Sequence, residues 1–482
     1  MPEEEKKPLD TYFFSPKKAL EIASKQNRVE TSVKVIDALQ VCYYASEEAI
    51  ENAPFNCIHV PLESVFDYFS STTNRFPQAI SFEDTDFSMV EQAELNAAFG
   101  EILGAAQEER RKLSQLYVKE IKEKQLDFKD EKLRVFIPAC RETTVMQYVA
   151  KNIAEAFEEL GYEVYYHIQS ELEDCNILSL FHNIWKFNPH IVVNINHLDN
   201  QHLNEKTFNF AWFQDPMPLM YDKKKEVNMR PRDFVYVLFE EYKDLLVKKG
   251  VEESRIKHQP FATNPKIFFK DESVKKENKI VFLGSDYNFE EGSDLDEEFI
   301  NDVYSHIENN TLSEELIAKY SKEYGISHSH FKTFLIPSFV RRRVILWLCS
   351  LKDIDIEVYG TDKWLNTPEV APFYKGLLPY GPQMAKVYNS AKYAIAAHPM
   401  YRYQQRVIEM AACDCIPIIY NCPLVCDIFY HEDNILSFST FEELKECVGK
   451  VPPKNCTQIA EDISYKKMAL SIIDTVEQQI KG

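Results

Sequence analysis

Four polar residues in the last quarter of the chain lie at the spacing of one helix face. Arg402, Gln405, Arg406 and Glu409 are three or four positions apart, so their side chains are expected to align. A cation there suits a phosphate group, and a carboxylate suits the hydroxyls of a ribose. Helix-start amides and the positive end of the helix dipole would add to phosphate binding. The alternative is that Arg406 and Glu409 form a solvated surface pair.

Two apolar runs on either side of this segment predict buried parallel strands. Residues 393–397 form a run short enough for a strand buried on both faces, and a helix is predicted before it over 382–390. The chain leaves the first strand at His398. Open α/β sheets bind ligands beyond the carboxyl ends of their strands, so His398 is expected beside a ligand.

Glycine marks further strand ends, although the chain has only 12 glycines in 482 residues. Two β-type runs end at Gly284 and Gly360, and Gly376 and Gly381 fall in tight loops. Such placement in a glycine-poor chain predicts close approach of the backbone to something at these points. The alternative for each glycine is an ordinary turn between a strand and a helix.

The middle of the chain repeats the pattern of apolar strands with polar ends. Strands are predicted at 133–141, 162–168, 190–196 and 208–213, and a helix over 143–160 is closed by Gly161. His197 follows the third strand and Asp215 the fourth. Asp215 could accept or orient a hydroxyl proton or cap a turn, and His197 could be a base or a hydrogen-bonded loop residue.

Composition and charge narrow the class of protein. The length of 482 residues and the hydrophobic content of 45% suffice for two or three domains with sizeable cores. The net charge of -21 argues against nucleic acid or an anionic membrane surface as the main partner. Neither an apolar leader nor a long uncharged apolar run is present, so we expect a cytoplasmic protein without stable membrane insertion.

The 11 cysteines are expected to be reduced and buried, because they lie in apolar runs without a secretory signal. A zinc site would need four of them to converge, and their spacing is not that of paired C-x2-C ribbons. Small buried hydrophobes are the favoured interpretation. The four that could suggest a metal are Cys413, Cys415, Cys422 and Cys426.

Five motifs of the second half of the chain occur in the order FLGS, EVYG, YKGLLPYG, VYNSAKYAIAAHP and RVIEMAACDCIPII. The chain resembles the donor domain of GT-B glycosyltransferases, and more narrowly the bacterial group 1 enzymes of the CgeB-like, spore-maturation type. Two upstream segments, AWFQDPMP and HQPFATNPKIF, are similar to the acceptor-domain motif and the interdomain crossover of that family, so the resemblance covers roughly 132–451.

The resemblance implies an α/β fold with two Rossmann-like domains facing a cleft. It implies an acceptor-side domain over 132–265, a donor domain over 266–455, and a last helix in 456–482 that crosses back. Residues 1–131 lie outside the resemblance and form a helical or mixed α/β accessory segment. Its helix over 92–123 could be a solvated linker, an oligomerisation surface or a binding surface for a protein acceptor.

The resemblance also assigns roles to the residues above. Glu409 matches the glutamate that holds the nucleotide ribose, whereas the family's second glutamate, eight positions earlier, is Tyr401 here. Contact with the sugar then falls to His398, Tyr401 or a backbone amide. Related enzymes carry an arginine and a lysine after the first donor-domain strand, where this chain has Asp286. One of the three arginines at 341–343 is expected to neutralise the diphosphate leaving group instead, and we predict that it is Arg342.

The predicted site has a catalytic and a donor-binding part. The catalytic candidates are Asp215, His197 and Arg406. The donor-binding candidates are Gly284, Ser285, Arg342, Gly360, Tyr380, His398, Tyr401, Arg402, Gln405, Arg406 and Glu409.

The resemblance implies transfer of a sugar from a nucleoside diphosphate sugar to a hydroxyl of a protein or surface-glycan acceptor. No cofactor or metal is expected, and the family favours retention of anomeric configuration. An acidic run over 286–308 contains the pair Asp294 and Asp296, a D-x-D of the kind that binds a metal in GT-A enzymes, but a solvated insertion is favoured. The alternatives are a non-catalytic GT-B scaffold, a nucleotide-sugar epimerase and a phosphorylase, and an oligomer is possible.

Overall fold

The chain forms two compact units. The computed structural model describes residues 9–26, 39–129, 132–287, 295 and 297–481, except 140, 142, 175–176, 216 and 223. Unit 1 comprises Met1–Tyr236, Leu246–Lys257 and Thr475–Gly482, and unit 2 comprises Val237–Leu245 and His258–Asp474. The last helix, α16 (Tyr465–Lys481), therefore begins in one unit and ends in the other.

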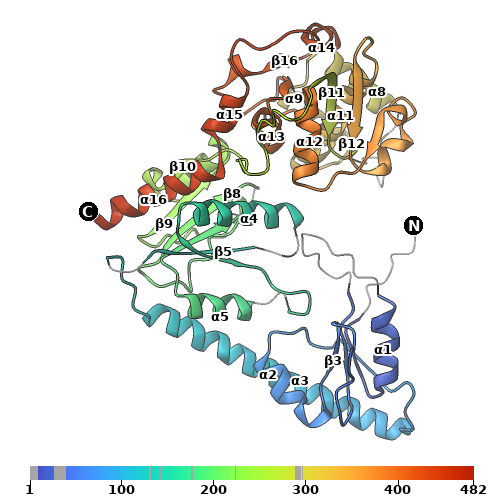
Figure 1. Cartoon of the computed structure of the whole chain (residues 1–482), viewed down its shortest axis with the longest axis vertical. Helices are drawn as coiled ribbons and strands as arrows, with labels where there is room; N and C mark the ends of the chain where they lie inside the picture. The colour runs from blue at the N-terminus through green and yellow to red at the C-terminus, as the bar shows by residue number, and fades with distance from the viewer. Residues whose placement is uncertain are drawn as a thin grey trace. The chain divides into compact units, whose positions relative to one another are not determined.

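Unit 1 contains a six-stranded sheet in the order β10-β9-β8-β7-β5-β6. Strand β5 runs parallel to β6 and β7, and β7 runs parallel to β8. Helices α4 and α5 cover opposite faces of this sheet (Figure 1). The elements are β5 (Arg134–Pro138), α4 (Thr144–Glu159), β6 (Glu163–His167), α5 (Ile177–Phe187), β7 (Ile191–Ile195), β8 (Phe208–Phe213), α6 (Pro218–Tyr221), β9 (Asp233–Val237), α7 (Glu240–Lys248) and β10 (Ile256–His258).

The sequence predicts these strands because β7 and β8 are fully buried apolar runs, as expected of strands covered on both faces. Gly161 closes α4 with a φ of 88°, and Gly250 follows α7 with a φ of 87°. Both glycines therefore have the left-handed conformation expected at a helix end. The prediction of a Rossmann-like α/β half in this part of the chain is confirmed.

The N-terminal segment adds a small parallel sheet to unit 1, in the order β3-β2-β1-β4. Residues 65–71 form a helix, and residues 27–38 lie outside the described part. The elements are β1 (Thr11–Phe13), α1 (Pro16–Ser24), β2 (Cys42–Tyr44), β3 (Cys57–His59), α2 (Val65–Ser71), β4 (Ala79–Ser81) and α3 (Met89–Glu123).

The long helix α3 is more than a solvated linker. It starts with a capping box, in which Ser88 and Glu91 each accept a hydrogen bond from the other's backbone. It buries Phe99, Ala106 and Ile121, and it packs against α2 and α5 (Figure 1). One face of α3 thus joins the N-terminal sheet to the larger sheet of unit 1, because α2 and α5 belong to the two sheets.

Unit 2 contains a second six-stranded parallel sheet, in the order β13-β12-β11-β14-β15-β16. Numbered along the chain this order is 3-2-1-4-5-6, the order of a doubly wound nucleotide-binding sheet. The chain changes direction across the sheet between β11 and β14. The strands are β11 (Glu277–Leu283), β12 (Asp355–Tyr359), β13 (Tyr374–Gly376), β14 (Ala391–Ala396), β15 (Ile416–Tyr420) and β16 (Leu436–Phe438).

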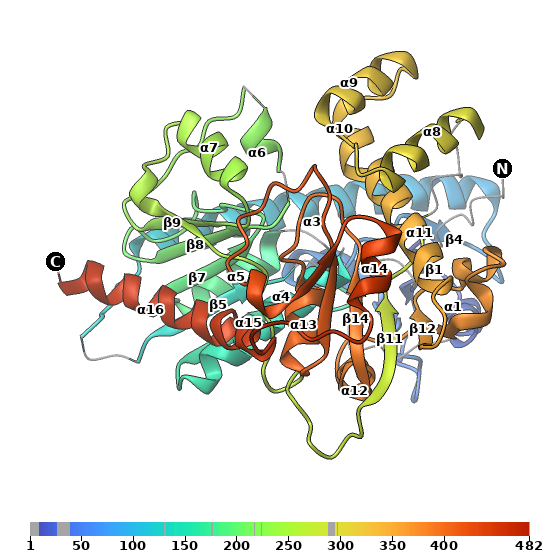
Figure 2. The same cartoon turned by 90° about the horizontal axis from the view of Figure 1, so that it is seen from above.

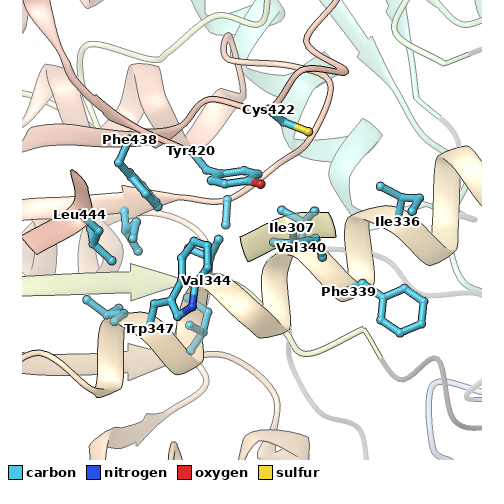
Figure 3. Packing of buried hydrophobic residues seen from close by; sticks show 14 of the residues in the cluster. Ile307, Ile336, Phe339, Val340, Val344, Trp347, Tyr420, Cys422, Phe438 and Leu444 are labelled. Atoms are coloured by element: carbon cyan, nitrogen blue, oxygen red, sulfur yellow. The ribbon is translucent and has the colours of Figure 1, made fainter. Parts of the chain in front are cut away.

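Helix α11 forms much of the core of unit 2. Its apolar side chains, including Val340, Val344 and Trp347, pack with Tyr420 and Phe438 of the sheet (Figure 3). Helices α8, α9 and α10 cluster at the N-terminal end of α11 (Figure 2). The helices are α8 (Glu297–Glu308), α9 (Glu314–Glu323), α10 (His328–His330), α11 (Ile336–Cys349), α12 (Pro382–Ser390), α13 (Gln405–Ala412), α14 (Phe441–Cys447) and α15 (Thr457–Asp462).

Part of the acidic run at 286–308 is structured, contrary to the expectation of a solvated insertion. Residues 297–308 form α8, which buries Phe299, Val303 and Ile307. Asp294 and Asp296 lie outside the described residues. In the part of the chain that the structure describes, no helix is long and apolar enough to span a bilayer.

The glycines at two neighbouring strand ends of unit 2 allow the chain to pack against itself. A Cβ on Gly360 would lie 2.2 Å from the carbonyl oxygen of Gly284. That oxygen accepts a hydrogen bond of 2.8 Å from the indole of Trp364. The close approach that the sequence predicts at Gly360 is therefore made by the protein's own backbone, which explains the residue without a ligand.

We predict that Gly360→Ala lowers the stability of unit 2 by about 1–3 kcal/mol, because backbone must move to make room. Gly104→Ala is the control, since a Cβ at this α3 position meets nothing within 4 Å. That control should be neutral or stabilising by about 0.5–1 kcal/mol. Thermal unfolding of both variants checks this, and an unchanged Tm for Gly360→Ala would contradict it.

Candidate functional site

The predicted donor-site residues gather at the point where unit 2 changes direction between β11 and β14. Gly284 and Ser285 follow the end of β11, and His398 follows the end of β14 by two positions. These strands are neighbours in the sheet and run parallel, so their carboxyl ends lie at one edge. That edge is where doubly wound sheets bind their ligands.

Glu409 on α13 is the most buried charged group of this region, with no exposed surface. Its carboxylate accepts hydrogen bonds from Gln405 at 2.8 Å and from Arg406 at 3.0 Å. The hydroxyl of Tyr380 also donates to it. Arg406 Nη1 lies 3.1 Å from the sulfur of Met384 on α12. The pair of Arg406 and Glu409 is therefore a built part of the domain and not the solvated surface pair considered above.

Burial and hydrogen bonding act in opposite directions on the Glu409 carboxyl. Loss of water raises its pKa, while the charge and hydrogen bond of Arg406 and the hydrogen bonds of Gln405 and Tyr380 hold that rise back. Arg406 differs from its partner because 39% of its side chain is exposed. The pair thus leaves the Arg406 side chain partly exposed and keeps the carboxylate inside.

Arg402 does not share the helix face with these residues, so this part of the prediction is wrong. Helix α13 begins only at Gln405, and Arg402 lies in the loop before it. Its Nε donates to Asp427 at 3.2 Å, and Nη1 pairs with Glu432. The backbone amide of Arg402 also donates to Asp427, at 2.7 Å. Two carboxylates far along the sequence hold Arg402, which therefore fixes the loop.

His398 is held in one tautomer by the chain around it. Its Nδ1 accepts a hydrogen bond of 3.2 Å from the amide of Met400, so a neutral ring carries its proton on Nε2. The ring stacks on Tyr401 with 5.1 Å between ring centroids. Burial and the nearby charge of Arg341 lower the pKa of His398 to about 3. His398 is thus a neutral hydrogen-bond donor over the physiological pH range.

Of the three consecutive arginines on α11, Arg341 reaches the strand end that the sequence singles out. Its Nη1 donates to the carbonyl of Ser285 at 3.0 Å, and its guanidinium lies 3.8 Å from the ring centroid of Tyr287. Its Nε is buried without a hydrogen-bond partner. Arg343 instead pairs with Glu308 of α8. The structure thus favours Arg341 over the predicted Arg342 as the arginine beside β11, and for Arg342 a donor role stays a prediction.

Burial and the charge of Arg406 both lower the pKa of Arg341, against the opposing effect of Tyr287 and Asp286. Arg341 also acts on the pKa of His398. The charge of Arg406 thus acts on Arg341, and the charge of Arg341 acts on His398, although the three residues come from α13, α11 and the end of β14. An anion at this edge of the sheet would meet two guanidinium groups and one neutral imidazole.

Unit 1 has its own pocket, of about 460 Å³, at the carboxyl ends of β5, β6, β7 and β8. Both predicted catalytic residues of this half, His197 and Asp215, line it. The pocket lies where the sheet changes direction between β5 and β7, as expected for an open α/β sheet. Its lining residues are Pro138, Ala139, Thr143, Met146, His167, Gln169, Leu180, Asn194, Ile195, Asn196, His197, Asp199, Asp215 and Met217.

Asn196 is a pocket residue that the sequence reading missed. Its Oδ1 accepts hydrogen bonds from the amides of Gln214 and Asp215 at 2.7 and 3.0 Å, and its Nδ2 donates to Asp215 Oδ2 at 2.7 Å. Asn196 has a φ of 63°, which asparagine tolerates better than most residues. Asn196 could have been found from the sequence, because it lies at a strand end directly before His197. Asn196 aims the Asp215 carboxylate.

The family model matches only part of unit 2. Residues 341–469 match the model of a family described as glycosyl transferase-like, a segment that starts at Arg341 and includes His398, Arg406 and Glu409. No curated protein matches the chain in sequence.

Several solved structures are similar over most of the chain. Sucrose-phosphate synthase from Thermosynechococcus elongatus has 10% identity and a TM-score of 0.46, covering 73% of this chain and 100% of its own. A glycosyltransferase from Rickettsia africae has 12% identity and a TM-score of 0.44, with coverage of 73% and 100%. HepE of Anabaena in complex with UDP-glucose has 9% identity and a TM-score of 0.43, with coverage of 72% and 100%.

A double-mutant cycle should detect the pairing of Arg406 with Glu409. We expect Arg406→Gln to destabilise unit 2 strongly, because it leaves a buried carboxylate without its cation. Glu409→Gln should cost less, since Arg406 is partly exposed and can turn to water. The coupling measured by urea unfolding should be about 1–3 kcal/mol. Additive effects of the two substitutions would show that the pair is not an energetic unit.

The low pKa of His398 predicts an acid-sensitive domain. Below pH 6.5 the unfolded chain binds a proton on this ring, whereas the folded protein binds it only near pH 3. Stability is therefore lost as the pH falls below 6.5. His398→Gln should reduce the stability lost between pH 7 and pH 5 by about 2 kcal/mol. Thermal unfolding at both pH values checks this, and parallel pH curves for both proteins would contradict it.

Proposed function

We propose that this protein is a glycosyltransferase that moves a sugar from a nucleoside diphosphate sugar to an acceptor hydroxyl. The observation that carries the proposal is the group of Arg341, His398 and the Arg406–Glu409 pair at the direction change of a 3-2-1-4-5-6 sheet. The match of 341–469 to a glycosyl transferase-like model supports the same reading. The bound UDP-glucose named for HepE suggests a uridine nucleotide as the first donor to try.

In the proposed reaction the donor diphosphate lies against the two guanidinium groups. Negative charge grows on the leaving diphosphate as the bond between sugar and phosphate breaks. Fixed cations and N–H donors aimed at that charge lower the barrier, and removal of one such donor costs about 10²–10³-fold in rate. Arg406 and Arg341 supply the cations, and His398 supplies an Nε2–H donor that stays available when the pH changes.

Glu409 is proposed to act on the ribose of the nucleotide. A carboxylate has about four positions for hydrogen-bond donors, and several are taken within the chain by Gln405, Arg406 and Tyr380. A ribose hydroxyl therefore has to share the carboxylate with these partners. We expect Gln405 and Tyr380 to line the same part of the donor site.

The acceptor side is assigned to the pocket of unit 1. Asp215 lines the pocket and is oriented by Asn196, so it can accept or orient the proton of an acceptor hydroxyl. We further propose that the reaction needs no metal, because the cations of unit 2 take the role of one, and that it retains anomeric configuration. Retention rests on the family resemblance.

A non-catalytic nucleotide-binding scaffold is the second candidate. It is favoured by Tyr401, which stands where the family carries a second glutamate and stacks on His398. A scaffold of this kind would bind a nucleotide without turning over the donor, and an epimerase would turn over the donor without an acceptor.

The first test is a thermal-shift screen of the full chain against nucleoside diphosphate sugars with EDTA present. A donor at 100 times its Kd should stabilise the protein by about 2.7 kcal/mol. Arg341→Gln should lose most of this shift, and Arg342→Gln shows whether the neighbouring arginine contributes as well. Circular dichroism of each variant confirms that it folds.

Release of nucleoside diphosphate from the donor that binds then separates the candidates. Release that depends on an acceptor supports the transferase. Binding without release supports the scaffold, and conversion of the donor sugar without acceptor supports the epimerase. Stabilisation that appears only with added manganese would contradict metal independence, and stabilisation by no donor at all would contradict the proposed function.

A further inference from the structure

The pocket of unit 1 contains no cation among its described lining residues. Its charged side chains are the carboxylates of Asp199 and Asp215, and its other polar groups are amides, imidazoles and one hydroxyl. Met146, Leu180 and Met217 add an apolar wall. A phosphate or carboxylate placed here would be repelled by two carboxylates and would meet no guanidinium or ammonium group of the lining.

Arg141 is the described cation closest in sequence to the end of β5, where the pocket begins. Its hydrogen bonds are made outside the pocket. It is 2% exposed, and its guanidinium donates to the carbonyls of Ser170 and Glu173. Arg141 is not among the lining residues, so it braces the loop after β6. The absence of positive charge is thus a property of how this pocket is built.

The polar groups of the pocket match a ligand rich in hydroxyls. Asp215 Oδ2 is held by Asn196, which leaves Oδ1 to accept a hydroxyl proton. Asn194 uses its Nδ2 on Asn209 at 2.8 Å, which leaves its Oδ1 as an acceptor. A saccharide offers many O–H donors to such acceptors and an apolar ring face to the methionines. The volume of about 460 Å³ lies within the range of small-molecule sites.

We propose that this pocket binds an uncharged saccharide unit of the acceptor and rejects phosphorylated or carboxylated acceptors. The inference rests on the proposed function, and it deepens that function by naming the chemical class of the acceptor group. In the transfer, the new bond forms between an acceptor sugar oxygen and the donor sugar carbon. The bond from that carbon to the diphosphate breaks, and the hydroxyl proton passes toward Asp215.

The test uses saturation-transfer difference NMR on the full chain. The neutral probes are the methyl glycosides of glucose, galactose, mannose and N-acetylglucosamine, and the anionic probes are glucose 6-phosphate and glucuronic acid. UDP is added in excess so that anionic probes do not report on a nucleotide site. We expect at least one neutral glycoside to bind and the anionic probes not to bind.

Three variants locate the binding. Asp215→Asn should weaken the neutral glycoside about tenfold or more, because a hydrogen bond to a charged group is lost. Asp199→Asn removes one of the two repelling carboxylates and should allow glucose 6-phosphate to bind. It is a second variant that folds if the first does not, because the position is exposed and asparagine tolerates its φ of 35°. Asp67→Asn is the matched control on α2, outside the lining, and should change nothing.

Several results would overturn the inference. They are equal binding of anionic and neutral probes to the unmodified protein, binding of a neutral glycoside that Asp215→Asn leaves unchanged, and no binding of any neutral glycoside. If donors bind in the thermal-shift screen while no glycoside binds, this inference fails and the proposed function stands. If a glycoside binds and Asp215→Asn weakens it while no donor binds, the pocket assignment stands and the proposed function fails.

Discussion

The site in unit 2 depends on one buried carboxylate. Glu409 has no exposed surface, and an isolated charge in such a place would cost several kcal/mol. The fold meets this cost with partners from α13 and from the start of α12, where Tyr380 and Met384 meet the pair. Because these partners must be in place before a ligand arrives, the packing of α12 against α13 is fixed by the same interaction that aims Arg406.

Arg406 and Glu409 have different roles in this pair. The guanidinium of Arg406 is partly exposed and able to meet an anion, whereas Glu409 is enclosed and already hydrogen-bonded. The main role of the Glu409 carboxylate is therefore to position Arg406, and contact with a ligand is its second role. A neutral His398 and a half-buried Arg341 lie at the same edge, so the charge offered to a ligand is positive although the whole chain carries -21.

Much of the fold could be predicted from the sequence, because parallel strands covered on both faces are short apolar runs with polar or glycine ends. The end of a strand before His398 and the helical spacing of Gln405, Arg406 and Glu409 were also predicted correctly, whereas the role of these residues in donor binding stays a prediction. The spacing of residues along a predicted helix does not reveal an ion-pair partner that is distant in the chain. Arg402 is taken by Asp427 and Glu432, and nothing near Arg402 in the sequence reveals those partners.

The same limit applies to the arginines at 341–343. All three stand on one helix, and only the tertiary packing of α11 beside β11 separates Arg341, which reaches Ser285, from Arg343, which pairs with α8. Strand order is a second property without a local signature. The 3-2-1-4-5-6 order of unit 2 brings Ser285 and His398 to neighbouring strand ends, although they are far apart in the sequence.

The N-terminal sheet supports the pocket of unit 1 through a short segment. The amide of Arg75 donates to the carbonyl of Leu172 at 2.8 Å, and the amide of Asp174 donates to the carbonyl of Thr73 at 2.9 Å. Arg110 of α3 is 4% exposed and donates to Asp174 at 2.8 Å. These contacts hold the loop that follows β6, and this loop also carries Gln169 of the pocket lining.

A buried arginine that loses its carboxylate, or the reverse, is strongly destabilising. Removal of the first 125 residues would therefore take away Arg110 and leave Asp174 and its loop without their support. A truncated chain that lost activity would not show that the N-terminal segment binds an acceptor, because the pocket loop itself would be altered. The N-terminal sheet is better understood as part of the framework of the pocket, and its share in acceptor choice has to be sought through substitutions that keep Arg110 in place.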